Sequence, residues 1–188
     1  MPSMRRSRRL GPPLDPAPPA HAFPPAGEYE IYSRPEFFVQ NGERGELLVC
    51  AGRIRLRTSD PVVDRRGRRR VKIEVLEWEA AGTSQILGGA EVRVSATRSL
   101  NSYVEAMSDR ADLPGRMVLS IMSTTWVNGE RVDEHRGRAE GLVSAFPPAR
   151  GDLFALSAPV AEHDLFALTG GALSGGLRIT ASNCKCAD

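Results

Sequence analysis

Three side chains in this sequence are candidates for chemistry at a carbonyl group: Glu77, Thr124 and His135. Each can supply a hydrogen bond to a polarised carbonyl oxygen, which lowers the barrier of an addition reaction modestly. Glu77 precedes Trp78, which fits either a carboxyl group at an apolar mouth or an exposed rim residue. His135 is the one histidine predicted to point inward, and its other interpretation is a hydrogen-bonded structural group.

Other kinds of active site have little support. The three histidines share no metal-ligand spacing, no Gly-x-Ser-x-Gly motif is present, and the glycine pairs 88–89 and 170–171 lack the Lys-Ser/Thr of a phosphate loop. The three cysteines, Cys50, Cys184 and Cys186, make no even disulfide framework and predict a reducing compartment. Because no further ligand lies near Cys184 and Cys186, a metal site there is weakly supported. We expect no cofactor.

The charge distribution gives no general field for nucleic acid or membrane, since the net charge is +2. Residues 65–70 hold five arginines around one glycine, which predicts either a solvated turn or a surface that docks an acidic partner. No aromatic residue is interleaved for base stacking. The basic N-terminus has no apolar signal region and no apolar run is long enough to span a bilayer, so we expect a cytoplasmic protein without nucleic-acid or membrane partners.

The elements that must position the candidate residues are β-strands, and the clearest are the two arms of a hairpin over residues 117–145. Asn128-Gly129 supplies the positive φ angles that a two-residue hairpin turn needs. In the first arm, Met122, Thr124 and Trp126 are predicted to share one face, which lines the interior. Alternation with polar residues in the second arm predicts an inward face made of His135, Gly137, Ala139, Gly141 and Val143.

Other alternating segments predict an all-β fold: a single small antiparallel β-barrel of about eight strands, wide enough to hold one small ligand. Residues 71–79 change phase at Leu76, which indicates a β-bulge. Residues 98–116 are predicted to form a short helix or a flap. The division of the chain is then a Pro- and Arg-rich tail or lid over 1–27, a barrel over 28–183 and a tail over 184–188.

Large apolar side chains exceed what a narrow barrel core needs, so they predict a cavity that binds a hydrophobic small molecule. Such a cavity also suits a reaction that needs proximity and orientation rather than acid, base or metal, such as folding a polyene so that its ends meet. The predicted substrate-binding residues are Phe37, Phe38, Trp78, Met117, Met122, Trp126 and Leu177.

Three segments resemble the bacterial spirotetronate and spirotetramate [4+2] cyclases, small barrels related in fold to allene oxide cyclases and dirigent proteins. They are the run from Glu74 to Ala96, the hairpin with its segment 138–141, and the closing strands from residue 157 to 182. The resemblance covers residues 70–182. It implies a cofactor-free, intramolecular Diels–Alder reaction of a linear polyketide that carries a tetronate or tetramate ring, with residues 1–27 as a lid.

The sequence departs from that family where an aromatic side chain would pack on the substrate. Leu177 stands in the last strand, and Leu119 or Ser120 replaces a tyrosine in the hairpin. The substrate contacts of the family are therefore not transferred to this chain.

Two rival functions stay open. The chain is alternatively a lipocalin-like protein that carries a hydrophobic ligand unchanged, or an interaction module whose arginines 65–70 dock an acidic partner. A barrel edge or the Phe37-Phe38 pair also fits a homodimer contact.

Overall fold

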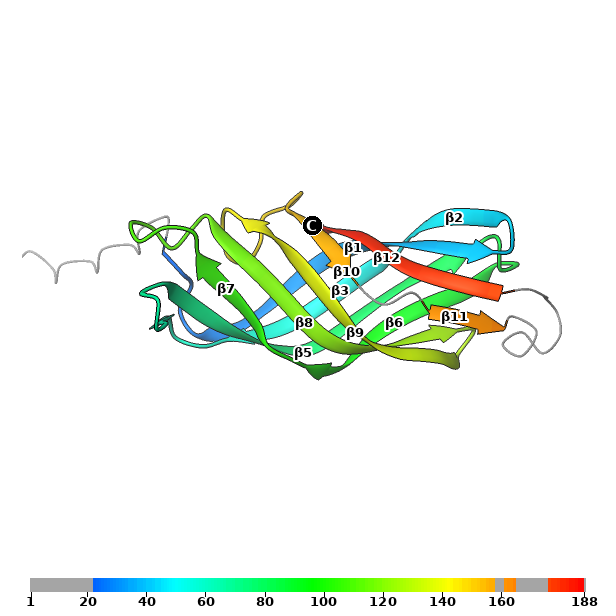
Figure 1. Ribbon diagram of the computed structural model, residues 1–188, viewed down its shortest axis with the longest axis horizontal. Coiled ribbons are helices and arrows are strands. Elements are labelled where there is room, and N and C mark those ends of the chain that lie inside the picture. Colours follow the sequence, from blue (N-terminus) through cyan, green and yellow to red (C-terminus); the bar gives the residue numbers. More distant parts are fainter. Residues whose placement is uncertain (1–21, 158–160, 165–175, 188) are drawn as a thin grey trace, which may run out of the picture.

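The computed structural model describes residues 22–157, 161–164 and 176–187, and these ranges contain strands and turns but no helix (Figure 1). The predicted all-β class is therefore confirmed. The strands are β1 (Gly27–Asn41), β2 (Arg44–Val49), β3 (Ala51–Thr58), β4 (Val62–Val63), β5 (Arg69–Ser84), β6 (Ala90–Ser99), β7 (Ser102–Ala106), β8 (Gly115–Val127), β9 (Glu130–Val143), β10 (Leu153–Ser157), β11 (Ala161–Asp164) and β12 (Gly176–Ala187).

Eight of these strands close into an antiparallel ring in the order β1-β3-β5-β6-β8-β9-β10-β12, with β12 pairing back to β1. Figure 1 shows the long strands crossing the molecule obliquely, as closure of a small barrel requires. The remaining strands extend the ring locally, since β2 pairs with β1, β4 with β5 and β11 with β12, while β7 lies between β5 and β8. The barrel predicted from strand spacing is thus present.

β8 and β9 form the predicted hairpin, and Figure 1 shows them side by side. Asn128 has φ 50° and Gly129 has φ 83°, the left-handed pair that this turn requires. Asn128 also ties the turn to β6, because its backbone N–H donates to the carbonyl oxygen of Glu91 and its Oδ1 accepts from the Glu91 N–H at 3.0 Å. The turn is therefore held from outside the hairpin as well as within it.

A β-bulge in β9 shifts the register of this hairpin by one residue. Trp126 lies opposite Arg131, whereas Thr125 lies opposite Asp133, so Val132 is the extra residue. Beyond the bulge, every residue of β9 faces a partner in β8 one position away from that of an unbulged two-residue hairpin.

A second bulge lies in β5, where the sequence pattern indicates it. The pairing with β3 slips between Arg55 and Leu56, which leaves Leu76 as the extra residue. Trp78 consequently packs against the interior, and Glu77 lies on the outer face. The bulge is thus the local reason for the change of phase that the alternation shows.

The prediction of a helix or flap over residues 98–116 is wrong, because β7 occupies part of this range. Its hydrogen bonds go to β5 on one side and to β8 on the other. Pairing with two neighbours stabilises the extended form, although Tyr103, Val104 and Met107 have helical spacing.

β12 continues to Ala187, beyond residue 183 where the sequence pattern placed the end of the barrel. Cys186 is buried and Cys184 half-buried, and both pack against the interior. Buried cysteine behaves as a small apolar residue, so the strand pattern extends through this segment.

The segment before β1 is anchored to the barrel by Phe23. Its ring is buried, and its backbone N–H donates to Oδ2 of Asp112 at 2.9 Å. Asp112 in turn pairs with Arg69 at 3.0 Å. The rest of the predicted tail or lid, residues 1–21, lies outside the described residues.

The arginines of segment 65–70 are partly used inside the molecule. Arg68 and Arg70 both pair with Glu105, a carboxylate whose side chain is 8% exposed. The guanidinium of Arg70 also lies over the Tyr103 ring, 4.0 Å from its centroid. Because a buried carboxylate needs charged partners, these two arginines have a structural function.

No helix in the described part of the chain has the length and apolar character to cross a membrane.

Replacement of Glu105 by Gln is expected to change how stability depends on pH. The hydrogen bond from Arg70 holds the pKa of Glu105 below its usual range, so its stabilising contribution is present above the unfolded-state pKa of about 4.3 and is lost as pH falls through the folded-state pKa. Denaturant unfolding should show E105Q losing about 1–3 kcal/mol at neutral pH and less of that difference near pH 3.

The matched control for this prediction is Glu74→Gln, because Glu74 pairs with Arg57 on the exposed outer face. That variant should unfold like the wild type. Equal effects of the two substitutions at neutral pH would contradict the role assigned to Glu105.

Alanine substitutions at two glycines of β9 are expected to differ in their effect on stability. At Gly141 a Cβ atom would lie 2.5 Å from the Leu153 carbonyl oxygen and 2.9 Å from Phe154 Cδ1, whereas at Gly137 its nearest contact would be 3.6 Å. Gly141→Ala must therefore separate β9 from β10, at a cost of about 1–3 kcal/mol, and Gly137→Ala should be nearly neutral. Urea unfolding of the two variants measures this difference. Similar midpoints for Gly141→Ala and Gly137→Ala would contradict the close approach of β9 and β10 at Gly141.

Candidate functional site

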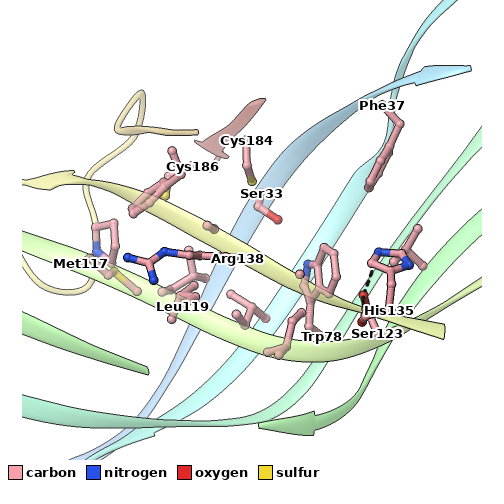
Figure 2. A pocket seen from close by; sticks show the side chains of 18 residues that line it. Ser33, Phe37, Trp78, Met117, Leu119, Ser123, His135, Arg138, Cys184 and Cys186 are labelled. Atoms are coloured by element: carbon pink, nitrogen blue, oxygen red, sulfur yellow. Dashed lines mark hydrogen bonds between the residues drawn. The ribbon is translucent and has the colours of Figure 1, made fainter. Parts of the chain in front are cut away.

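A cavity of about 80 Å³ lies inside the barrel (Figure 2). Two apolar clusters occupy the interior, one around Leu56, Ile73 and Met117 and the other around Val39 and Val92, and residues of both line the cavity. Trp78 packs against both clusters. The cavity therefore lies where the two halves of the core meet.

Alternate residues of the hairpin strands form one wall of the cavity. β8 contributes Met117, Leu119, Ile121 and Ser123, and β9 contributes His135, Gly137 and Ala139 together with Arg138 between the last two. Figure 2 shows Met117 and Cys186 toward one end and Phe37, Ser123 and His135 toward the other, with Ser33 and Cys184 between them. The rest of the wall comes from β1, β3, β5, β6, β10, β12 and Pro148.

A chain of hydrogen bonds joins Ser123, His135 and Asp133. The Ser123 Oγ lies 3.2 Å from Nε2 of His135, and Nδ1 of His135 lies 3.1 Å from Oδ2 of Asp133. Ser123 is buried, while the side chains of His135 and Asp133 are 14% and 28% exposed. This order of hydroxyl, imidazole and carboxylate orients the imidazole ring and equips it to donate, accept or transfer a proton.

Register explains how the three side chains meet. Ser123 and His135 lie directly opposite each other on β8 and β9, and Asp133 precedes His135 by two residues on the same face. Without the bulge at Val132, a two-residue hairpin would instead place Met122 opposite His135. The bulge therefore assembles this site.

The other polar groups on the wall are Ser33, Arg138, Cys184 and Cys186, and the guanidinium of Arg138 pairs with Glu140 at 2.7 Å. Burial raises the pKa of the Cys184 thiol to about 11 and that of Cys186 to about 12, so both stay protonated at neutral pH. Ser33 is buried between strands and lines the cavity near Cys184. Within the described ranges, no cluster of three His, Cys, Asp or Glu side chains has the arrangement of a metal site.

Four of the residues predicted for the site lie on the cavity wall: Phe37, Trp78, Met117 and His135. Phe37 and Met117 are also buried members of the core clusters. Trp78 reaches the wall because the bulge in β5 turns it inward. These four side chains are positioned to touch a ligand in the cavity.

Glu77 and Phe38 lie outside the cavity. Glu77 is on the outer face, where it pairs with Arg53 at 3.1 Å and with Arg55 at 3.7 Å. Phe38 is 43% exposed and covers Gly45 of the neighbouring strand, which has no side chain of its own. Side chains alternate between the two faces of a strand, so Glu77 beside the inward Trp78 and Phe38 beside the inward Phe37 both point outward.

Met122, Thr124 and Trp126, predicted for the cavity wall, lie on the opposite face of β8 from Ser123. Trp126 pairs with Arg93 of β6, whose guanidinium lies 5.4 Å from its ring centroid. The sequence could not distinguish the two faces of β8, because both are buried along most of its length. Leu177 lies in β12, where its backbone pairs with Asn41 of β1, and its side chain is not among those that the structure describes.

Sequence reasoning missed two residues of the site, Ser123 and Asp133. Asp133 was detectable, because the alternation that turns His135 inward also applies two positions earlier. Ser123 had no such signal, since its position opposite His135 depends on the bulge at Val132.

Comparison with known proteins identifies a fold relative but no family. No protein-family model and no curated protein matches the sequence. The chain is similar in structure to DynF from the dynemicin biosynthesis pathway of Micromonospora chersina, with 14% sequence identity and a TM-score of 0.53. The match covers 92% of this chain and 85% of that one. At this identity the similarity demonstrates a shared fold.

Proposed function

We propose that this protein binds a slender hydrophobic chain, such as a linear polyene, inside its barrel, with a polar group of the ligand at His135. The observation that supports this function is the cavity wall, which is mostly apolar and carries a few polar groups, namely Ser33, Ser123, His135, Arg138 and two thiols. Small-molecule sites share this composition, in which apolar walls supply affinity and a few polar groups orient the ligand.

The size of the cavity favours an extended ligand. Its volume of about 80 Å³ corresponds to roughly five to eight water molecules. Figure 2 shows the lining side chains spread from Met117 and Cys186 at one end to Phe37 and His135 at the other, and a small space drawn out in this way suits a linear chain better than a polycyclic molecule. The geometry therefore supports binding of an unfolded chain more directly than enclosure of a cyclised product.

The fold similarity to DynF supports a place in natural-product biosynthesis. DynF comes from the dynemicin biosynthesis pathway, and its structure is similar to this one over most of both chains. We therefore place the proposed ligand among the hydrophobic intermediates of such pathways.

The two tryptophans of the chain provide the test of binding. Trp78 lines the cavity, whereas Trp126 lies on the outer face of β8 beside Arg93. A brominated long-chain alcohol quenches indole fluorescence only on contact, so it should quench the wild type and Trp126→Phe but not Trp78→Phe. Quenching that persists in Trp78→Phe would contradict binding inside the barrel.

Filling the cavity provides the second arm of this test. Gly137 faces the cavity, and a Cβ atom there meets only ordinary contacts. Gly137→Leu should keep the fold and weaken binding of the probe at least about tenfold, or 1.4 kcal/mol. Phe38→Ala, on the exposed outer face, is the matched control and should bind like the wild type.

A second candidate function is cofactor-free [4+2] cyclisation of a linear polyketide that carries a tetronate or tetramate ring. The specific observation is that the imidazole of His135 and the hydroxyl of Ser123 lie at the cavity wall, where either can hydrogen-bond to a carbonyl conjugated with the dienophile. Such a reaction also requires the cavity to widen around the folded chain.

The cyclase candidate predicts a product of unchanged mass. A linear polyene with a terminal tetronate ring, incubated with the full chain, should be converted to an isomer of shifted chromatographic retention. His135→Gln should slow that conversion about tenfold through the loss of one hydrogen bond. Recovery of unchanged substrate, with Trp78 quenched by the bound polyene, would reject cyclisation and leave the carrier function standing.

A further inference from the structure

The chain Ser123–His135–Asp133 is a polar arrangement at the wall of a mostly apolar cavity. Polar groups beside apolar surface are costly unless hydrogen-bonded, and here each of the three has a partner. None of them comes from a turn or a surface loop, since all three lie within β8 and β9. Rigid strands hold the imidazole at a defined place on the wall.

The hydrogen bonds assign the tautomer of His135. The Asp133 carboxylate can only accept, so Nδ1 carries the proton and Nε2 of the neutral ring has a lone pair. The Ser123 hydroxyl has two acceptors within reach, Nε2 at 3.2 Å and the His135 carbonyl oxygen at 3.4 Å. Rotation of the Ser123 side chain about its Cα–Cβ bond would move Oγ away from Nε2 and free the lone pair for a ligand.

We propose that His135 is a general base that moves a proton on a bound chain bearing an enolisable carbonyl group, with Asp133 as a positioning residue. The carbon–hydrogen bond next to the carbonyl breaks, its proton goes to Nε2, and its electron pair forms an enolate. The imidazolium then returns the proton to the same carbon or to the far end of a conjugated system. Asp133 stabilises the imidazolium between the two steps.

Acyl transfer by Ser123 has less support, although the order of the three groups is the same as in serine hydrolases. That reaction uses the Ser123 hydroxyl as the nucleophile and still needs other donors aimed at an oxyanion, whereas in proton transfer the same hydroxyl can donate to the enolate oxygen. Around Ser123 the backbone of β8 is paired with β6 on one side and β9 on the other. The ladder thus uses the N–H groups of this part of the strand, and proton transfer is the chemistry that the remaining groups can perform.

The proposal rests on the binding function, and one probe separates the two. A long-chain β,γ-unsaturated methyl ketone carries an acidic carbon–hydrogen bond, and moving that proton to the γ carbon gives the conjugated enone, which absorbs in the ultraviolet. The wild-type full chain should accelerate this isomerisation and incorporate deuterium from heavy water. His135→Gln should lower kcat about 100-fold or more, within the range of general base catalysis.

Three further variants separate catalysis from structural support. Asp133→Asn should lower kcat about tenfold with KM unchanged, because the ring loses its orienting charge. His135→Ala should regain activity when imidazole is added, which a purely structural histidine would not show. Ser120→Ala is the matched control, since Ser120 lies on the opposite face of β8 and accepts a bond from Arg136 at 3.4 Å.

The outcomes are distinguishable. If the ketone displaces the brominated alcohol from Trp78 but is not isomerised, the proton-transfer proposal is overturned and the binding function stands. If the ketone fails to displace the bound alcohol, the proton-transfer proposal alone is overturned, and if neither compound reaches Trp78, both are overturned. Wild-type rates in His135→Gln, or no rescue by imidazole in a folded His135→Ala, would also overturn the assignment of His135 as the base.

Discussion

The register of the β8–β9 hairpin is the constraint on which the candidate site depends. Asn128 and Gly129 form the turn, and the bulge at Val132 then shifts β9 by one residue relative to β8. Because strand side chains alternate with a period of two, a shift of one residue exchanges the inward and outward partners across the pair. The bulge thereby places Ser123 opposite His135 and fixes the only Ser-His-Asp chain that the described strands present to the cavity.

The cavity exists because the two core clusters do not fill the space where they meet. Trp78 bridges them from β5, and Gly137 leaves room on the facing strand of the hairpin. Apolar space that remains unfilled loses dispersion contacts, which is unfavourable unless a ligand supplies them. The few polar groups on the wall then determine the orientation of a ligand more than its affinity. Binding and proton transfer are compatible functions of one such site.

The sequence predicted the inward residues correctly in strands that have one polar face. In β9 the alternation of charged and small residues predicted the inward position of His135, and in β5 the change of phase at Leu76 indicated the bulge that turns Trp78 inward. In β8 the prediction of the inward face failed, because Ser120 and Thr124 on the outer face are as deeply buried as Ser123 on the inner face. With no polar face to mark solvent, nothing local distinguished Met122 from Ile121.

The sequence by itself determined the all-β class and the hairpin turn, and the number and spacing of its strands indicated a barrel, since alternation, β-branched residues and left-handed glycine positions act locally. Only the tertiary structure decided which side chains share the cavity. The strand at β7 forms because β5 and β8 offer it hydrogen bonds, and β12 reaches Ala187 because β1 pairs with it to close the ring. The meeting of Ser123 with His135 likewise depends on pairing across strands, where a single extra residue changes the partner without changing the local pattern.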